Sequence, residues 1–374
     1  MAKISVVDLS LTKLEKRLDA EYYKTEFLDN DAKICSHDFK PLVKLTKKID
    51  VGFVGSMVQA YTDKGISLLQ TRNIDEFFTN LNSIVSITEK FHKLLKKSQI
   101  HYGDILVARS GSFGNASIYL DQEICNSSDI IILEPNSEIN PFYLVAFLNS
   151  KFGRNQLLRF ASGGVQGHVN LTILEQLKVP LLQEKVQVQI QNMVQNSKIK
   201  IDLANKQYHT AEQLLLNELS FSDYSPKHQL SFESNLKEII EKERYDAEYY
   251  QPMYKKIRDK ITNYLNKSKP LKEIIKIKKA TYFPKDNQEY KYIELSNISS
   301  NGTISSCALD LGKNLPSRAR RKLVKGDVII SSIEGSLDSC AIITEEYDGA
   351  LCSTGFFVIN SNEINPETLL VLSK

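Results

Sequence analysis

Three short segments contain side chains of the kinds that act chemically on DNA. The segment NPFY, from Asn140 to Tyr143, has the Asn-Pro-x-aromatic pattern with which amino-methyltransferases hold a flipped adenine. The segment VGFVGS, which begins at Val51, is rich in glycine, as loops that bind a cofactor are. The segment DNQEYK, from Asp286 to Lys291, offers acidic residues and a Glu-x-Lys, as metal-dependent nucleases do. Each segment raises the possibility of a DNA-modifying enzyme.

A structural role explains each of these segments better. The second Asn-Pro pair, at Asn365, is followed by Glu-Thr, which cannot stack on a base, so the shared feature is the start of a helix. VGFVGS lacks the G-x-G-x-x-G spacing, and no G-x-x-x-x-G-K-(S/T) segment is present. Asp286 precedes Glu289 by only three positions, a spacing that favours a solvated strand edge over a metal site.

The composition is that of a globular protein with more than one domain. Of the 374 residues, 42% are hydrophobic and 25% charged, and the net charge is +3. Five scattered cysteines without a C-x-x-C pair argue against a disulfide framework and against a structural zinc site. No apolar run reaches about 18 residues, and no signal peptide is apparent. We therefore expect a cytoplasmic protein without a membrane partner.

The sequence contains an internal repeat. RLDAEYY begins at Arg17, and RYDAEYY begins at Arg244. Four more pairs follow in the same order, separated by 223 to 229 positions: KPL at Lys40 and Lys269, LQTRNI and IELSNI ending at Ile74 and Ile298, GDILVARSGS and GDVIISSIEGS beginning at Gly103 and Gly326, and EINP at Glu138 and Glu363. This collinearity predicts two copies of one domain. Because the tyrosines of DAEYY occur in both copies, packing or docking is favoured over base reading for Tyr22, Tyr23, Tyr249 and Tyr250.

Each copy is expected to be rich in β-strands. Alternating and β-branched segments predict strands at 66–74, 83–88, 103–111, 116–120 and 128–135, and again at 290–298, 326–336, 340–344 and 355–360. A single helix is predicted at 140–160, capped by Asn140. A helix without Pro or Gly at 183–219 could extend roughly 55 Å, with an apolar seam for another helix. The fold class predicted is α+β, with two mixed β-rich domains at 1–180 and 223–374 joined by a long coiled-coil-type spacer helix at 181–222.

This arrangement resembles the specificity subunit of type I restriction–modification systems. The resemblance covers essentially the whole chain and rests on the paired DAEYY segments, the two copies of GDILVARSGS, and ASGGVQGHVNLTILEQLKVPLLQEKVQ, a turn that leads through Val-Pro into the long helix. Leu181 and Leu182 stand where the family usually has proline. The second copy is expected to lack its own turn and helix. A shortened sequence, a shortened reading frame and a helix supplied by another chain stay open.

The resemblance implies two target-recognition domains that each read one half of a bipartite site in double-stranded DNA. It implies a chain without catalytic residues or metal that docks two methyltransferase subunits and motor–nuclease subunits. S-adenosylmethionine, ATP and magnesium would be bound by those partners. The alternatives are a self-contained adenine methyltransferase or nuclease, and an interaction module that does not bind DNA.

The candidate DNA contacts are basic, amide or hydroxyl side chains at strand ends and turns, where they can reach phosphates or base edges. They are Lys47, Lys48, Gln70, Arg72, Asn73, Arg109, Ser110, Ser112, Lys276, Lys278, Lys279, Asn297, Arg318, Arg320 and Arg321. The predicted seam for a partner helix comprises Val186, Ile190, Met193, Ile201, Tyr208 and Leu215. A solvated surface is the competing interpretation of any single basic residue.

Overall fold

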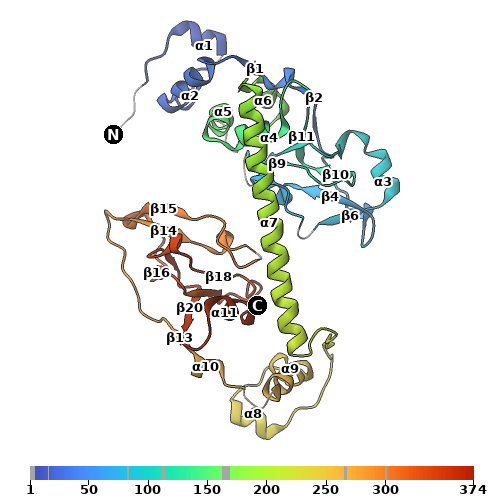
Figure 1. Ribbon diagram of the computed structural model, residues 1–374, viewed down its shortest axis with the longest axis vertical. Helices are drawn as coiled ribbons and strands as arrows, with labels where there is room; N and C mark the ends of the chain where they lie inside the picture. Colours follow the sequence, from blue (N-terminus) through green and yellow to red (C-terminus); the bar gives the residue numbers. More distant parts are fainter. Residues whose placement is uncertain are drawn as a thin grey trace. The chain divides into compact units, whose positions relative to one another are not determined.

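The computed structural model describes residues 5–15, 17–81, 84–110, 114–161, 169–264, 268–299 and 301–374 (Figure 1). The chain divides into two compact units, unit 1 (Met1–Ile201) and unit 2 (Asp202–Lys374). The predicted DNA contact Ser112 and most of the predicted ASGGVQGH turn lie outside the described residues.

Unit 1 is built around two five-stranded sheets. The first has the strand order β2 (Thr46–Val51), β11 (Ile130–Pro135), β8 (Ile105–Ala108), β9 (Ala116–Ile118) and β5 (Phe77–Phe78). The second has the order β3 (Tyr61–Thr62), β6 (Val85–Ile87), β4 (Ile66–Gln70), β10 (Cys125–Ser128) and β7 (Gln99–Ile100). A short antiparallel pair joins β1 (Phe39–Pro41) to β12 (Lys178–Pro180).

Strand β8 shows how the sequence specifies this packing. Ile105 and Val107 face a core that contains helix α4, whereas Leu106 and Ala108 face a core shared with residues of the second sheet. Successive side chains of a strand point to opposite faces, so a strand covered on both faces is apolar throughout. The uninterrupted apolar run of GDILVA is therefore a buried central strand.

Unit 2 repeats the same strand orders. One sheet runs β13 (Ile275–Ile277), β20 (Phe356–Ser361), β17 (Val328–Ser331) and β18 (Cys340–Ile342). The other runs β15 (Ala308–Leu311), β14 (Glu289–Ile293), β19 (Leu351–Ser353) and β16 (Ala319–Lys322). These match β2-β11-β8-β9 and β6-β4-β10-β7 of unit 1 strand for strand. The predicted repeat is thus a repeat of the fold, and the predicted fold class is confirmed.

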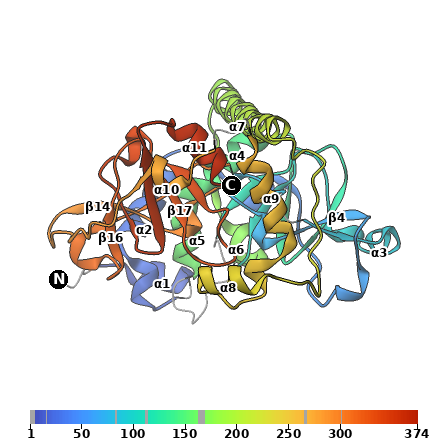
Figure 2. The ribbon, with the colours of Figure 1, turned by 90° about the horizontal axis from the view of Figure 1, so that it is seen from below.

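The helices also follow the repeat in part. Unit 1 contains α1 (Leu9–Glu15), α2 (Thr25–Cys35), α3 (Glu89–Leu94), α4 (Pro141–Asn149), α5 (Lys151–Ala161), α6 (Leu171–Gln176) and the start of α7 (Glu184–Glu218). Unit 2 contains the rest of α7, and α8 (Leu236–Lys242), α9 (Pro252–Thr262), α10 (Leu271–Ile274) and α11 (Pro366–Leu372). Helix α11 corresponds to α4 and lies beside the part of α7 that belongs to unit 2 (Figure 1 and Figure 2).

The prediction of a single helix at 140–160 is wrong, because this segment forms two helices, α4 and α5. Ser150 has an extended backbone, with φ −68° and ψ 161°. Gly153 follows at a point where a Cβ atom would lie 2.4 Å from the Phe147 carbonyl oxygen. The chain therefore turns sharply onto the end of α4. The cap was predicted correctly, since the Asn140 side chain accepts hydrogen bonds from the Phe142 and Tyr143 amides.

The DAEYY segment packs differently in the two copies. In unit 1 the segment forms a single 3-10 turn, and Tyr22 is 1% exposed, as the predicted packing role requires. The Arg17 and Arg159 guanidinium groups lie 4.7 and 4.2 Å from the centre of its ring. In unit 2 the corresponding Tyr249 is 37% exposed and has only Arg244 over its ring, at 4.6 Å, among the described residues. The motif is therefore fully packed in unit 1 alone.

Thiol labelling of the native protein should separate the cysteines by burial. Burial raises the pKa of the Cys125 and Cys352 thiols to about 12, so almost no thiolate, the nucleophilic form, is present at neutral pH. Cys35 is exposed. We expect iodoacetamide at pH 7.5 to modify Cys35 and to leave Cys125 and Cys352 unmodified until guanidinium is added. Peptide mass spectrometry measures this, and modification of Cys125 in the native protein would contradict the packing between the sheets.

Candidate nucleic-acid interface

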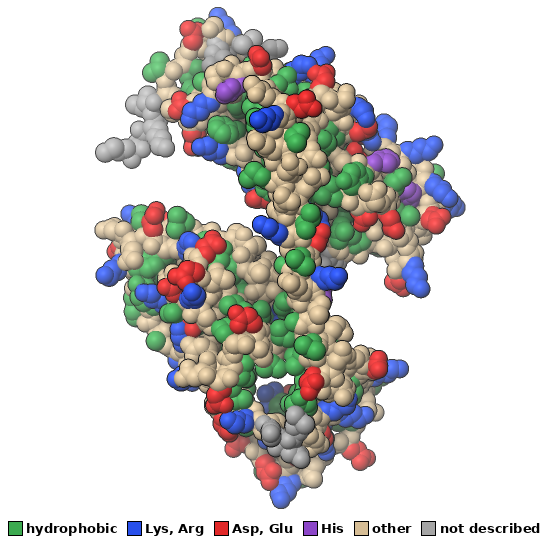
Figure 3. Space-filling view, viewed as in Figure 1, with side chains coloured by type: hydrophobic (Ala, Val, Ile, Leu, Met, Phe, Trp, Pro, Cys, Tyr) green, Lys and Arg blue, Asp and Glu red, His purple; other side chains and the backbone are tan. Residues whose placement is uncertain are grey.

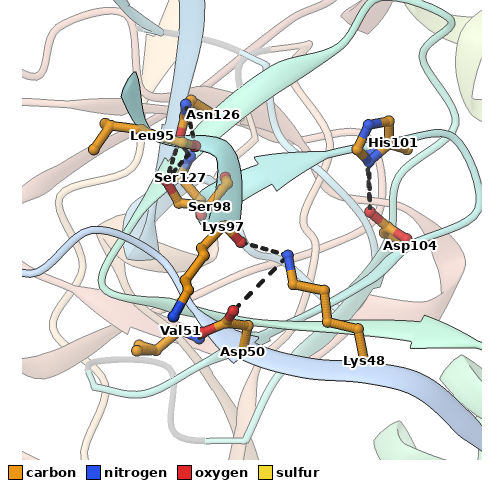
Figure 4. A network of polar contacts seen from close by, with 10 residues as sticks. All are labelled: Lys48, Asp50, Val51, Leu95, Lys97, Ser98, His101, Asp104, Asn126 and Ser127. Atoms are coloured by element: carbon orange, nitrogen blue, oxygen red, sulfur yellow. Dashed lines mark hydrogen bonds and ion pairs between the residues drawn. The ribbon is translucent and has the colours of Figure 1, made fainter. Parts of the chain in front are cut away.

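The two lysines predicted to contact DNA near the start of unit 1 lie side by side on strand β2. The Lys47 side chain is 62% exposed, and its Nζ lies 3.2 Å from Glu134 of strand β11. Lys48 is 32% exposed, donates to the Lys97 carbonyl and lies 3.9 Å from Asp50 (Figure 4). Because an exposed ion pair contributes at most about 1 kcal/mol, Lys47 can exchange its carboxylate partner for a phosphate at little cost. Lys47 is therefore the more available of the two.

A buried polar network lies beside Lys48 and fixes the edge of the second sheet (Figure 4). The Ser98 hydroxyl donates to Asn126 Oδ1, and the Ser127 hydroxyl donates to the Ser98 carbonyl at 3.1 Å. All three side chains are at most 3% exposed. Nearby, Asp104 accepts a hydrogen bond from the His101 amide, and burial raises the pKa of this carboxyl group. Sequence reasoning missed this network because isolated Ser and Asn residues give no pattern.

The QTRN segment forms a capped turn at the end of strand β4. The Gln70 side chain accepts from the Asn73 amide, and the Asn73 side chain accepts from the Gln70 amide at 2.9 Å. Asn73 also donates to the Asn80 carbonyl and is only 1% exposed. A buried amide that is occupied in this way cannot contact DNA in this conformation, so Asn73 is corrected to a residue that shapes the turn. Gln70 is half-buried and Arg72 is exposed, and their DNA contacts stay predictions.

Arg109 connects three segments at the same end of unit 1. Its Nη1 lies 2.8 Å from the Asp129 carboxylate, and its Nε donates to the Val169 carbonyl. The Asp129 carbonyl in turn accepts from the Thr71 hydroxyl of the QTRN turn. Asp129 has a positive φ of 56° between strands β10 and β11, a conformation that asparagine and aspartate tolerate better than most residues. Arg109 thus links the end of strand β8 to Asp129 and Val169, and it can contact DNA only if it leaves Asp129.

The predicted lysines of unit 2 divide into a buried contact and two exposed side chains. Lys278 donates to the Asp327 carboxylate at 2.7 Å, and Asp327 is 2% exposed. Lys276 and Lys279 are exposed. On the face of the molecule drawn in Figure 3, basic side chains are interspersed with acidic ones. Of these lysines, Lys278 is held in its ion pair with Asp327, whereas Lys276 and Lys279 are exposed and can approach a phosphate.

Asn297 repeats the role of Asn73. Its side chain accepts from the Glu294 amide at 2.7 Å, and the Glu294 side chain accepts from the Asn297 amide. Asn297 also donates to the Ser306 hydroxyl at 3.0 Å. Because its amide group is used in this turn, a DNA contact by Asn297 is not favoured. The two copies therefore share one capped turn at the ends of strands β14 and β4.

The basic segment SRARRK lies at strand β16, and its arginines are used differently. The Arg320 guanidinium lies 4.8 Å from the centre of the Phe283 ring, and its Nε donates to the Ser317 carbonyl. Arg321 donates to the Lys279 and Ala280 carbonyls. Arg318 is exposed and lines a cavity of about 280 Å³ together with Tyr292 and Glu294. Arg318 is the arginine of this segment best placed to meet a ligand.

The predicted seam on α7 is shared between packing inside the units and exposed surface. Ile190 packs on the unit 1 core, and Tyr208 packs against Leu369 and Leu370 of unit 2. Met193 and Ile201 are 72% and 45% exposed, whereas Val186 and Leu215 are half-buried. Two of the six predicted seam residues are therefore already covered by this chain, and contact of the other four with a partner helix stays a prediction.

Polar contacts that the sequence did not reveal fix α7 to unit 1. The Gln187 side chain accepts a hydrogen bond from the Asn140 amide at 3.0 Å, and the Asn140 side chain donates to Gln191. Gln187 is 8% exposed. The helix cap of α4 is thus also the contact that orients α7. Gln187 and Gln191 lie one turn apart on α7, and only this spacing in the sequence could have indicated the contact.

The described residues offer neither a metal-binding cluster nor a membrane-spanning helix. They contain no group of three or more His, Cys, Asp or Glu side chains placed to hold a metal ion. Within the described part of the chain, no helix is both long enough and apolar enough to cross a bilayer.

The comparison with protein families identifies the class of domain. Residues 45–213 match the family model described as the type I restriction modification DNA specificity domain. Over these residues, which cover the two five-stranded sheets of unit 1 and most of α7, the chain is similar to that family. The family predicted from the sequence is confirmed.

Individual relatives are more distant. A type II methyltransferase of Methanocaldococcus jannaschii, M.MjaIV, is 35% identical over 79 residues, which are 20% of this chain and 26% of that protein. This chain thus spans about a quarter of the length of that curated relative. The type I restriction–modification S subunit of M. genitalium is 13% identical, with a TM-score of 0.37 over 90% of this chain and 76% of that one. The HsdS subunit of Thermoanaerobacter tengcongensis is 12% identical, with a TM-score of 0.28 over 90% and 79%.

Proposed function

We propose that this chain is the DNA-specificity subunit of a type I restriction–modification complex, in which each unit reads one half of a bipartite target. The observation that carries the proposal is the duplication. Both units have the same strand orders and the same capped turn, and unit 1 matches a family of DNA specificity domains. Two copies of one reading domain in one chain suit two half-sites at a set separation.

The proposal assigns catalysis to other chains. Two methyltransferase subunits dock on the chain and transfer a methyl group from S-adenosylmethionine to adenine, and motor–nuclease subunits that use ATP and magnesium cut the DNA. The chain itself contributes recognition and assembly in the cytoplasm. In support, NPFY provides a helix cap at Asn140, and DNQEYK leads into strand β14. Neither segment is needed for chemistry.

The proposal is tested by expressing the chain with its neighbouring modification subunit and mapping adenine methylation across the host genome. We expect a bipartite motif with a fixed gap. Exchange of residues 1–180 for those of another specificity subunit should change one half of the motif and keep the other. A palindromic motif would indicate that a single unit reads DNA, and binding of S-adenosylmethionine by the purified chain alone would instead support a self-contained methyltransferase.

The DNA contacts should depend on salt. Each phosphate that a lysine or arginine neutralises lowers the slope of log K against log salt by about 0.9. We expect the exposed-lysine variant Lys47→Ala to make the slope of the assembled complex less negative by about one unit and to leave the methylation motif unchanged. Fluorescence anisotropy at several salt concentrations measures the slope. DNA binding of the complex without salt dependence would contradict contact with phosphates.

A further inference from the structure

The cavity beside strand β14 is a built polar site. Its volume is about 280 Å³, and its lining includes Tyr292, Glu294, Ser296, Arg318 and Ser353. Tyr292 is 2% exposed, and among the described residues its buried hydroxyl group has no hydrogen-bond partner. Because native structures rarely leave a buried polar group unpaired, we expect this hydroxyl to gain a partner when a ligand occupies the cavity.

In unit 1 the position that corresponds to Tyr292 is occupied by Leu68. Strands β14 and β19 correspond to β4 and β10, and Tyr292 pairs with Leu351 as Leu68 pairs with Asn126. Leu68 is fully buried and packs in an apolar cluster with Met57 and Ile87. The place of the Tyr292 hydroxyl is thus taken by an aliphatic side chain in unit 1. The two units differ in chemistry at one position of the same fold.

The rim of the cavity carries one donor and one acceptor group of opposite charge. Arg318 is exposed and, among the described residues, forms no ion pair. The Glu294 carboxylate accepts a hydrogen bond from the Asn297 backbone amide and has further lone pairs that can accept other hydrogen bonds. Burial raises the pKa of the Tyr292 hydroxyl, and the nearby Arg318 and Ser353 side chains oppose this shift. Arg318 therefore already lies close to the buried hydroxyl.

We propose that this cavity is where unit 2 reads a guanine–cytosine pair of its half-site. Arg318 donates two parallel hydrogen bonds to O6 and N7 of guanine, and Glu294 accepts from the N4 amino group of the paired cytosine. The buried Tyr292 hydroxyl accepts a remaining guanidinium proton and so positions Arg318, because arginine has five N–H donors in a fixed fork. This inference rests on the proposed function and assigns one base pair of the half-site to Arg318 and Glu294.

The test uses the chain assembled with its modification subunit and the methylation map described above. Arg318→Ala should make one G·C position of the unit 2 half-site degenerate, with discrimination lowered about 10- to 100-fold. Arg318→Lys should have the same effect, because lysine cannot form the bidentate contact. Tyr292→Phe should weaken discrimination at the same position to a smaller extent. The half-site of unit 1 should not change in any of the three variants.

Arg258→Ala is the matched control. Arg258 is an exposed arginine of helix α9, which does not line the cavity, so its loss should leave the motif unchanged. A thermal unfolding midpoint close to that of the wild type would show that each variant folds. If Arg318→Lys keeps the motif while Arg318→Ala lowers methylation evenly at all sites, Arg318 contacts a phosphate and the inference fails.

The outcomes also separate this inference from the proposed function. A wild-type motif that persists in Arg318→Ala overturns the reading role and leaves the bipartite recognition intact. A wild-type complex that produces no motif overturns the proposed function and the inference together. Relaxation at two or more separate base pairs would show a general loss of docking, which also contradicts the assignment of one pair to one arginine.

Discussion

Replacing Tyr22 by alanine is expected to lower the free energy of unfolding of unit 1 by about 3–5 kcal/mol, as for other buried aromatic residues. Tyr22 is 1% exposed, has two guanidinium groups over its ring and donates to the Glu15 carboxylate at 2.9 Å. The alanine variant loses the buried ring and leaves Arg159, itself 6% exposed, without the aromatic face that it packs on. Denaturant unfolding with hydrogen exchange of residues 20–35 measures the loss.

The internal repeat supplies the control for this variant. Tyr249→Ala removes the same residue of the same motif in unit 2, where the ring is 37% exposed and has one guanidinium group over it. We expect a loss of about 1 kcal/mol or less, because an exposed cation–π contact contributes about 0.5–1 kcal/mol. Equal losses for Tyr22→Ala and Tyr249→Ala would contradict the difference in packing between the two copies.

Replacing Lys278 by alanine should destabilise unit 2 by about 2–3 kcal/mol, less than the loss of a fully buried ion pair because a third of the lysine side chain is exposed. The variant leaves the Asp327 carboxylate, which is 2% exposed, with only the Val324 amide and the Asn360 side chain as donors among the described residues. An unpaired buried charge is costly because its hydration is not replaced. Thermal and denaturant unfolding of the purified chain measure the change.

Lys276→Ala separates folding from DNA binding. Lys276 is two positions earlier on the same strand and exposed, so its loss should change stability by no more than about 0.5 kcal/mol. A stability loss for Lys276→Ala as large as for Lys278→Ala would show that strand β13, and not the Asp327 contact, is responsible. Reduced DNA binding by Lys278→Ala at temperatures where the variant is folded would return Lys278 to the DNA-binding surface.

Much of the fold could be predicted because the sequence contains the same pattern of segments twice. The Gly-Asp segments at Gly103 and Gly326 lead into uninterrupted apolar strands, and the structure places both as central strands covered on two faces. The long helix was evident from 35 residues without Pro or Gly, Glu184–Glu218. Local patterns of this kind depend on backbone geometry and burial, which amino-acid type reports well.

The site was less predictable because its residues depend on contacts between distant segments. Asn73 and Arg72 are neighbours of similar polarity, yet only Asn73 is enclosed by the turn. Ile190 and Met193 both fit a helical seam, but one packs on unit 1 and the other is 72% exposed. In the sequence, Tyr292 cannot be told apart from any other tyrosine of a strand. Only the structure shows that it lines a cavity. Spacing along the chain carries no information on which of these side chains a tertiary contact will occupy.

The capped turn shared by the two units has a consequence for how such a protein can change. Its shape is held by its first and fourth positions, Gln70 with Asn73 and Glu294 with Asn297. The two positions between them are Thr-Arg in one copy and Leu-Ser in the other. The second of these positions, Arg72 in one copy and Ser296 in the other, is exposed, so substitution there alters the chemistry presented to solvent without altering the backbone. Mutation and recombination can therefore replace these inner residues, and with them the sequence preference of a unit, while the backbone of the turn is kept.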